Sequence, residues 1–165
     1  IPQLRAAFAR DGTITAASSS SISDGAAALV ITRESVANAQ GKAPLARIVA
    51  MAAHAQAPED FTTAPVGAIR KVLDKAGWSV EDVDLWEVNE AFACVAMFAM
   101  RDIGISHERI NVNGGAIALG HPIGASGARI VVTLLNALKE RGGRRGVASL
   151  CIGGGEGTAL ALELV

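Results

Sequence analysis

Residues 113–129 read NGGAIALGHPIGASGAR, a stretch that surrounds His121 with five glycines. Glycine is entropically costly inside a packed element, so such a cluster indicates unusual backbone angles or a ligand that lies close to the main chain. No linker is needed at this point of the chain. We therefore expect a bulky ligand to pass along residues 113–129.

A helix is predicted directly after this stretch. Ser126 is a candidate N-cap, apolar residues recur at helical spacing from Ile130 to Leu138, and Gly142-Gly143 end the pattern. His121 therefore precedes a helix N-terminus, whose positive dipole end disfavours an imidazolium. A lone histidine often only hydrogen-bonds loop backbone. The glycine-rich setting favours a neutral His121 that can accept a proton instead.

The composition fits one domain of the α/β class. Half of the 165 residues are hydrophobic but only 4% are aromatic, which suits small side chains packed between helices and a sheet. A net charge of −1 with mixed signs argues against a nucleic-acid or anionic-membrane partner. No run resembles a transmembrane span or a secretory signal. Cys94 and Cys151 form no disulfide framework, so a reducing, cytoplasmic setting is expected.

The first 41 residues contain two ambiguous segments. The chain starts at Ile1-Pro2 without a methionine, which looks like a cut end. The serine run 18–21 is either a flexible linker or an ordered, hydroxyl-rich loop between apolar flanks. The apolar segment 26–31 is either a short buried strand or a small-residue helix that runs into a strand. We place the internal boundary at residues 41–44.

Beyond this boundary, predicted strands and helices alternate. Strands are expected over 45–54, 84–88, 110–113, 147–151 and 158–165, with helices after the first three. The last two strands follow each other through a tight glycine turn and should pair antiparallel. This order implies a mostly parallel five-stranded sheet with helices on both faces and one antiparallel strand. Ligands meet such sheets at the C-terminal ends of the strands, where Asn89, His121 and Cys151 fall.

Cys151 is the candidate for thiol chemistry. It stands where a strand meets Gly153-Gly154-Gly155. An ordinary thiol has a pKa of ~8.5, and amide dipoles or a positive group can move it toward working pH, whereas a buried inert cysteine is the alternative. The N–H of Gly153 can stabilise an oxyanion. Asn89 can position water or a carbonyl, and Glu90 is either a base or a structural hydrogen-bond partner at a helix start.

Three motifs resemble, in order and spacing, the C-terminal signatures of the thiolases. They are Asn89-Glu90-Ala91-Phe92, residues 114–127 and Cys151-Ile152-Gly153-Gly154-Gly155. The resemblance implies a thiolase-like layered fold, of which this chain looks like only the C-terminal part. Residues 1–17 correspond to the tail of the loop region, 18–41 to the last segment of the N-terminal domain, and 42–165 to the C-terminal domain.

The resemblance also implies a role for each site residue. Cys151 is implied as the acid/base thiol that deprotonates the acetyl-CoA methyl group in condensation or protonates the leaving enolate in cleavage. His121 is implied to activate the nucleophilic cysteine and to bind the thioester oxyanion, with Asn89 holding the water that completes this hole. Gly153 is implied to offer its N–H to a second oxyanion hole.

Coenzyme A binding is implied at three further residues. Ser20 matches the family serine that contacts the pantetheine arm, and Phe92 and Phe61 are expected to line the same tunnel. Ser18 stands where the family usually has asparagine. The resemblance implies no metal and no other cofactor, because the coenzyme A thioester is itself the substrate.

The nucleophilic cysteine of the thiolases lies in a motif that no part of this chain resembles, and Cys94 does not substitute because it lies inside a predicted helix. A base and oxyanion holes without a nucleophile leave the covalent step undone, so we expect the isolated chain to be inactive. The expected partners are acyl-CoA substrates, the missing N-terminal half, and further copies in a homodimer or homotetramer. Neither a nucleic acid nor a membrane is expected.

The predicted function is that of a thiolase of fatty acid metabolism, which condenses two acetyl-CoA into acetoacetyl-CoA or cleaves 3-ketoacyl-CoA. The alternative is a non-catalytic interaction or CoA-binding module made of the C-terminal half alone, which should self-associate through exposed apolar surface. Condensing enzymes of fatty-acid synthesis usually place two histidines, or a histidine and an asparagine, around the nucleophile, and Cys151 in its turn favours a thiolase. A further alternative, a dinucleotide-binding protein, is supported only by the glycine content.

Overall fold

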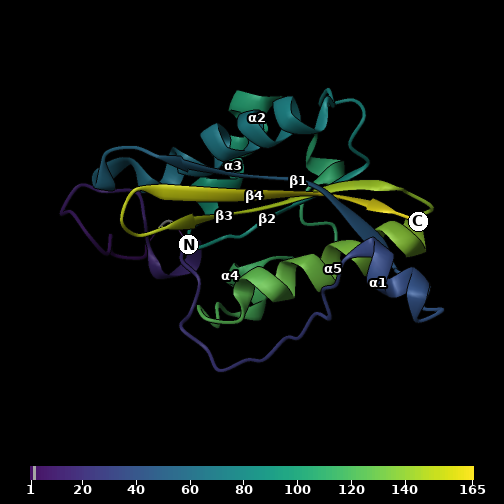
Figure 1. Cartoon of the computed structure of the whole chain (residues 1–165). Helices are drawn as coiled ribbons and strands as arrows, with labels where there is room; N and C mark the ends of the chain where they lie inside the picture. Colours follow the sequence, from purple (N-terminus) through teal and green to yellow (C-terminus); the bar gives the residue numbers. More distant parts are fainter. Residues whose placement is uncertain (2) are drawn as a thin grey trace.

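A four-stranded sheet organises the molecule in the computed structural model, which describes residues 1 and 3–165 (Figure 1). The order across the sheet is β1 (Ala46–Ala55), β4 (Glu156–Leu164), β3 (Arg145–Ile152) and β2 (Leu85–Val88). β2 and β3 are parallel, whereas β4 is antiparallel to both β3 and β1. Three strands therefore run in one direction and β4 runs against them, as predicted.

Helices cover both faces of the sheet, which confirms the layered α/β class. α2 (Ala64–Ala76) and α3 (Ala93–Ile103) lie on one face, and α5 (Ser126–Arg141) lies on the other (Figure 1). The shorter helices are η1 (Ala16–Ser18), α1 (Glu34–Ala39), η2 (Pro58–Thr63), η3 (His107–Arg109) and α4 (Ala116–Leu119). Within the described residues, no helix is both long and apolar enough to cross a membrane.

The sheet separates two hydrophobic cores. Successive side chains of a strand point to opposite faces, so in β3 Val147 joins the core under α2 and α3 while Ala148 joins the core over α5. Ile69 of α2 and Leu134 of α5 are fully buried, one in each core. Both faces of the sheet are thus closed by apolar side chains, and the strand ends are left to carry polar groups.

The expected fifth strand at 110–113 is wrong, because it is reduced to a single parallel bridge between Trp86 and Ile110. The chain turns away at Asn111, whose φ is 47°. The Asn111 side chain takes over the pairing: its Oδ1 accepts from Val88 N (2.8 Å) and its Nδ2 donates to Val88 O (2.9 Å). A side-chain amide therefore satisfies β2 where a backbone strand was expected, since asparagine tolerates this left-handed conformation.

The apolar segment 26–31 forms neither the strand nor the helix that its sequence predicts. Val30 is fully exposed, and Ile31 keeps 70% of its surface in solvent. An isolated strand gains hydrogen bonds and burial only from neighbours. None of the described strands of this chain pairs with residues 26–31.

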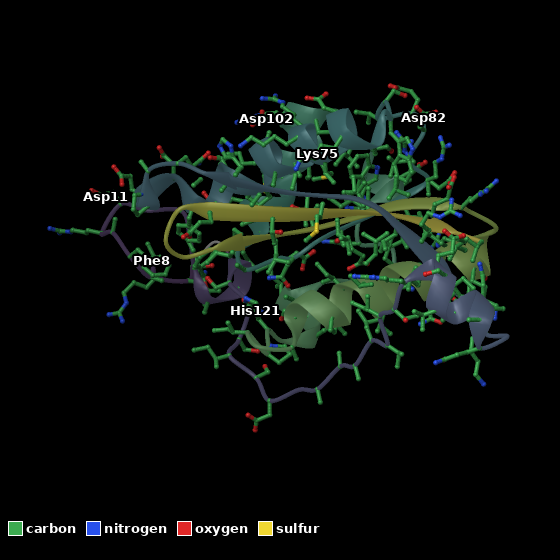
Figure 2. The ribbon with its side chains drawn as sticks, viewed as in Figure 1. Phe8, Asp11, Lys75, Asp82, Asp102 and His121 are labelled. Carbon is green, nitrogen blue, oxygen red and sulfur yellow. The ribbon has the colours of Figure 1, made fainter. Side chains whose placement is uncertain are left out.

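β1 is an edge strand, and two lysines of α2 donate hydrogen bonds to its backbone carbonyl groups. Lys71 Nζ donates to the carbonyl oxygen of Ala53 (3.3 Å) and Lys75 Nζ to that of Met51 (3.0 Å). Figure 2 shows Lys75 on the α2 side of the sheet.

Candidate active site

Asn89 and His121 meet beside the C-terminal end of β2. Asn89 follows this strand, is almost fully buried, and is tied to β3 by its backbone N–H, which donates to Ser149 O (2.9 Å). His121 lies in the loop between α4 and α5, on the α5 side of the sheet (Figure 2). Its Nε2 is 3.4 Å from Asn89 Nδ2. The structure thus brings together two predicted site residues that are 32 positions apart in the chain.

Ser126 holds the Nδ1 side of the His121 ring. The Ser126 hydroxyl donates to Pro122 O (3.1 Å), and His121 Nδ1 lies 2.6 Å from the same Oγ. With the hydroxyl proton assigned to Pro122 O, Nδ1 carries the hydrogen of this contact, and Nε2 has its lone pair toward Asn89. The predicted N-cap role of Ser126 is wrong, since α5 begins at Ser126 itself, which makes no side-chain capping bond.

The pKa of His121 is lowered, which is the direction that the sequence predicted. Burial lowers the pKa of the imidazole, and the Arg129 guanidinium lowers this pKa further. The expected direction was argued from the α5 dipole, whereas the structure shows burial as the leading cause. A neutral ring with a lone pair on Nε2 can accept a proton.

A buried ion pair lies behind Asn89 and was missed by the sequence reasoning. Glu87 Oε2 is 3.4 Å from Arg129 Nη1, and Arg129 Nη2 is 3.5 Å from Asn89 Oδ1. The Glu87 side chain is only 2% exposed. Burial raises the pKa of Glu87 to about 7, with Arg129 opposing this rise and Glu90 adding to it. Glu87 and Arg129 are 42 positions apart, so no local pattern links them.

Cys151 is a buried, protonated thiol near the end of β3. Burial raises its pKa to about 11, and the nearby Cys94 adds to the rise. The expectation that amide dipoles move this pKa toward working pH is therefore wrong, because the favourable backbone contact at Cys151 is outweighed by loss of solvent. In this state Cys151 is suited to give a proton. Cys94 lies in α3 and its pKa is also raised, again mainly by burial.

The glycine turn after Cys151 is pinned against the end of β1. Gln56 N donates to Gly155 O (3.0 Å), and Gly155 has a φ of +101°. A Cβ at Gly155 would lie 2.4 Å from Gln56 O, so only glycine fits. Around Gly153, in contrast, the space is open. The turn is therefore rigid at one end and accessible at the other.

The serine run 18–21 is an ordered loop, and the flexible-linker alternative is wrong. The backbone N–H and the hydroxyl of Ser20 both donate to Ala91 O, at 3.1 and 3.0 Å. His121 N donates to Ser21 O (2.8 Å), and Ser19 forms a bridge with Phe92. This loop therefore joins the Asn89–Phe92 motif to the His121 loop.

Three phenylalanines gather beside this loop. The ring centroids of Phe61 and Phe92 are 6.0 Å apart, and those of Phe8 and Phe92 are 5.6 Å apart, both edge to face. Phe8 lies on the N-terminal segment and is mostly exposed (Figure 2). Phe61 and Phe92 were predicted for this place, whereas Phe8 was missed because nothing in its local sequence marks it.

Glu90 makes the hydrogen bonds that the structural alternative predicts for it. Its Oε1 accepts from Asn111 Nδ2 (3.1 Å) and its Oε2 from Ile117 N (3.2 Å). Gly115 makes room for the carboxylate, since a Cβ there would overlap it. Across the described part of the chain, no group of three or more His, Cys, Asp or Glu side chains is placed to hold a metal ion.

The family follows from direct comparison. Residues 42–164 match the family model described as "Thiolase, C-terminal domain", and residues 1–35 match "Thiolase, N-terminal domain". The chain belongs to the thiolase family, as its three motifs predicted.

Curated relatives agree with this assignment. The chain is 53% identical to an acetyl-CoA acetyltransferase of Allochromatium vinosum, over 98% of this chain and 41% of that protein. It is 52% identical to one of Chromobacterium violaceum, over 99% of this chain and 42% of that protein. The chain thus spans about two fifths of the length of these relatives.

Solved structures give the same result. The fold is similar to the crystal structure of the Bacillus anthracis acetyl-CoA acetyltransferase, with a TM-score of 0.96 and 46% identity. It is also similar to human mitochondrial 3-ketoacyl-CoA thiolase in complex with CoA, with a TM-score of 0.91 and 41% identity. Each match covers 99% of this chain and 42% of the other.

Proposed function

We propose that this chain supplies the acid–base part of a thiolase active site, in a protein that condenses two acetyl-CoA or cleaves 3-ketoacyl-CoA by thiolysis. The observation that carries the proposal is the Asn89–His121–Ser126 chain of contacts, in which the imidazole has a lowered pKa and its Nε2 lone pair faces Asn89. The matching relatives are named acetyl-CoA acetyltransferases, which supports the same reaction.

His121 acts first in this scheme. Its Nε2 takes the proton of a nucleophilic cysteine supplied by the N-terminal part, and the resulting thiolate attacks the 3-keto carbon of the substrate. The imidazolium then carries hydrogen on both nitrogens, so Nε2–H donates to the oxyanion that forms. Asn89 Nδ2, on the same side, holds a water that gives the second donor.

Cys151 completes the cleavage. When the carbon–carbon bond breaks, the leaving acetyl-CoA enolate takes the thiol proton of Cys151, and Gly153 N–H stabilises the enolate oxygen. The Cys151 thiolate then removes the proton of an incoming CoA thiol, whose sulfur takes the acyl group from the nucleophilic cysteine. Condensation is the reverse, with the thiolate removing a methyl proton. The raised pKa of Cys151 favours the protonated state that starts cleavage.

Coenzyme A is proposed to bind along Ser20, Phe92 and Phe61. The Ser20 hydroxyl donates its hydrogen to Ala91 O, which leaves its lone pairs for a pantetheine N–H. The edge-to-face pair of Phe61 and Phe92 offers an apolar wall for the pantetheine chain.

The N-terminal half of a thiolase is the proposed main partner. Ile22, Val30 and Ile31 are largely exposed, as expected of side chains that another part of the protein covers. We divide the chain into 1–17, 18–41 and 42–165, as the sequence predicted. A homodimer or homotetramer, a role in fatty acid metabolism and a cytoplasmic location belong to the same proposal.

The test is a thiolysis assay with acetoacetyl-CoA and CoA. The chain would be joined to the N-terminal part of the Allochromatium vinosum relative and compared with the chain alone. We expect turnover only in the joined protein, and a loss of about 10³-fold or more in its His121→Ala and Cys151→Ala variants. Glu163→Gln, which changes a distant carboxylate beside Arg145, is the matched control. Sustained turnover by the chain alone would show that the missing nucleophile is not needed.

A further inference from the structure

Arg129 connects a buried carboxylate to the amide of a predicted site residue. One guanidinium nitrogen faces Glu87 Oε2 at 3.4 Å, and the other faces Asn89 Oδ1 at 3.5 Å. Both contacts are long, but they come from one planar fork that can serve two acceptors at once. The side chains of Glu87 and Arg129 are 2% and 19% exposed.

Stability alone does not explain this pair. Among the described residues, Glu87 Oε1 and Arg129 Nε are buried without a hydrogen-bond partner. A buried ion pair with incomplete hydrogen bonding commonly contributes no more than an apolar replacement, because desolvation offsets the attraction. The arrangement is better explained by what Arg129 does at Asn89.

We propose that Arg129, anchored by Glu87, is a positioning residue that fixes the Asn89 amide against His121 and keeps a positive charge beside this imidazole. Arg129 donates to Oδ1 of Asn89, which leaves Nδ2 as the atom that faces His121 Nε2. Without this contact, the amide could turn over and present an oxygen, which cannot donate to the Nε2 lone pair. The inference rests on the proposed function for its catalytic meaning, but the contacts themselves do not.

The positive charge of Arg129 also favours the neutral form of His121, because it lowers the pKa of the ring. Arg129 is the charged group that acts on His121, and Glu87 and Glu90 are the charged groups that act on the Arg129–Glu87 pair behind it. Arg129 is the one that lowers the pKa of His121, in addition to burial. A positive charge near the ring therefore supports a neutral, proton-accepting histidine.

The experiment separates charge from geometry by NMR titration of the chain with ¹³C-labelled histidine. In Arg129→Met, the His121 midpoint should move to higher pH, because the nearby positive charge is gone. In Arg129→Lys, which keeps the charge but not the fork, the midpoint should stay near wild type. Arg129→Gln gives a second neutral variant with the same expected rise. Arg47→Met removes an exposed pair with Glu34 and is the matched control, and the other two histidines serve as internal references.

The geometric role is tested in the protein joined to the relative's N-terminal part. Arg129→Met and Arg129→Lys should each lower kcat for thiolysis by about 10- to 100-fold, with KM for the thioester changed far less. An unchanged His121 midpoint in folded Arg129→Met, or full turnover in Arg129→Lys, would overturn the proposal. If the wild-type joined protein does not turn over but the midpoints move as expected, the pair stands and only the proposed function fails.

Discussion

Residues 42–165 and residues 1–41 differ in how far their apolar side chains are buried. The longer region closes two cores around its sheet, whereas in the described part of the shorter region Ala37 alone is buried. Both regions carry apolar runs of similar appearance in the sequence. An apolar run therefore becomes a strand only when its neighbours are present to pair with it.

Leu134 and Val30 are apolar side chains of the two regions that differ most in burial. Leu134→Ala empties a fully buried site in the α5 core and should lower the free energy of unfolding by about 3 kcal/mol. Val30→Ala, at a fully exposed site, should change it by less than about 0.5 kcal/mol. Urea unfolding of the chain measures both. Similar losses in the two variants would mean that residues 26–31 are packed in solution.

Glu87 is a buried acidic side chain, whereas Glu34 is an exposed one. Burial raises the pKa of Glu87 from 4.5 to about 7, so the folded chain holds this proton more tightly than the unfolded chain. The resulting stability is complete below pH 4.5 and is lost as the pH rises through about 7. Relative to Glu87→Gln, the wild type should lose about 2–3 kcal/mol between pH 4.5 and 8. Glu34→Gln, in the exposed pair with Arg47, should show no such slope.

A third expected effect tests the pinned glycine turn. Gly155→Ala combines a φ of +101° with a Cβ 2.4 Å from Gln56 O and should cost about 2 kcal/mol. Gly153→Ala, where the neighbouring space is open, should cost much less. Thermal unfolding followed by circular dichroism compares the two. Equal costs would contradict the rigid attachment of this turn to β1.

The Asn111 side chain pairs with β2 where a neighbouring strand was expected, so its removal should destabilise this edge of the sheet. Asn111→Ala loses three side-chain hydrogen bonds, two to Val88 and one to Glu90, and should cost about 1–2 kcal/mol. Hydrogen exchange at the Val88 amide should rise most. Asn136→Ala, whose amide bonds only to its own helix, is the control.

The Ser20 hydroxyl contact to Ala91 O joins residues 1–41 to residues 42–165. Ser20→Ala removes the hydroxyl contact to Ala91 O and should cost about 0.5–1 kcal/mol. Limited proteolysis within residues 1–31 should become faster. Ser21→Ala, which loses only an exposed contact with Ser23, should leave the rate unchanged. If both variants behave alike, the serine loop is not what attaches the N-terminal region.

Much of the fold was predictable because its signals are local. The strands β1 to β4 lie close to their predicted ranges, and the helices α2, α3 and α5 follow where helices were expected, since apolar periodicity and glycine stops act over a few residues. The lost fifth strand depends instead on one side chain, Asn111, that reaches another element. Whether residues 26–31 form a strand depends on neighbouring strands, which the sequence of this segment does not reveal.

The candidate site divides in the same way. The motifs around Asn89, His121 and Cys151 could be found from residue types and order. The thiol pKa of Cys151 could not, because burial is a property of the folded chain and here outweighs the backbone. The Arg129–Glu87 pair and the Ser126 contact to His121 were also invisible, since each needs a side-chain direction that no periodicity supplies.

The lysines of α2 should oppose association of copies of this chain at high concentration. An incoming strand that tried to extend the sheet at β1 would need the carbonyl oxygens of Ala53 and Met51, which already accept from Lys71 and Lys75. It would have to displace two ammonium groups and bring its own backbone beside their charges. The long, alanine-rich edge is thereby guarded against fibril-like stacking of copies.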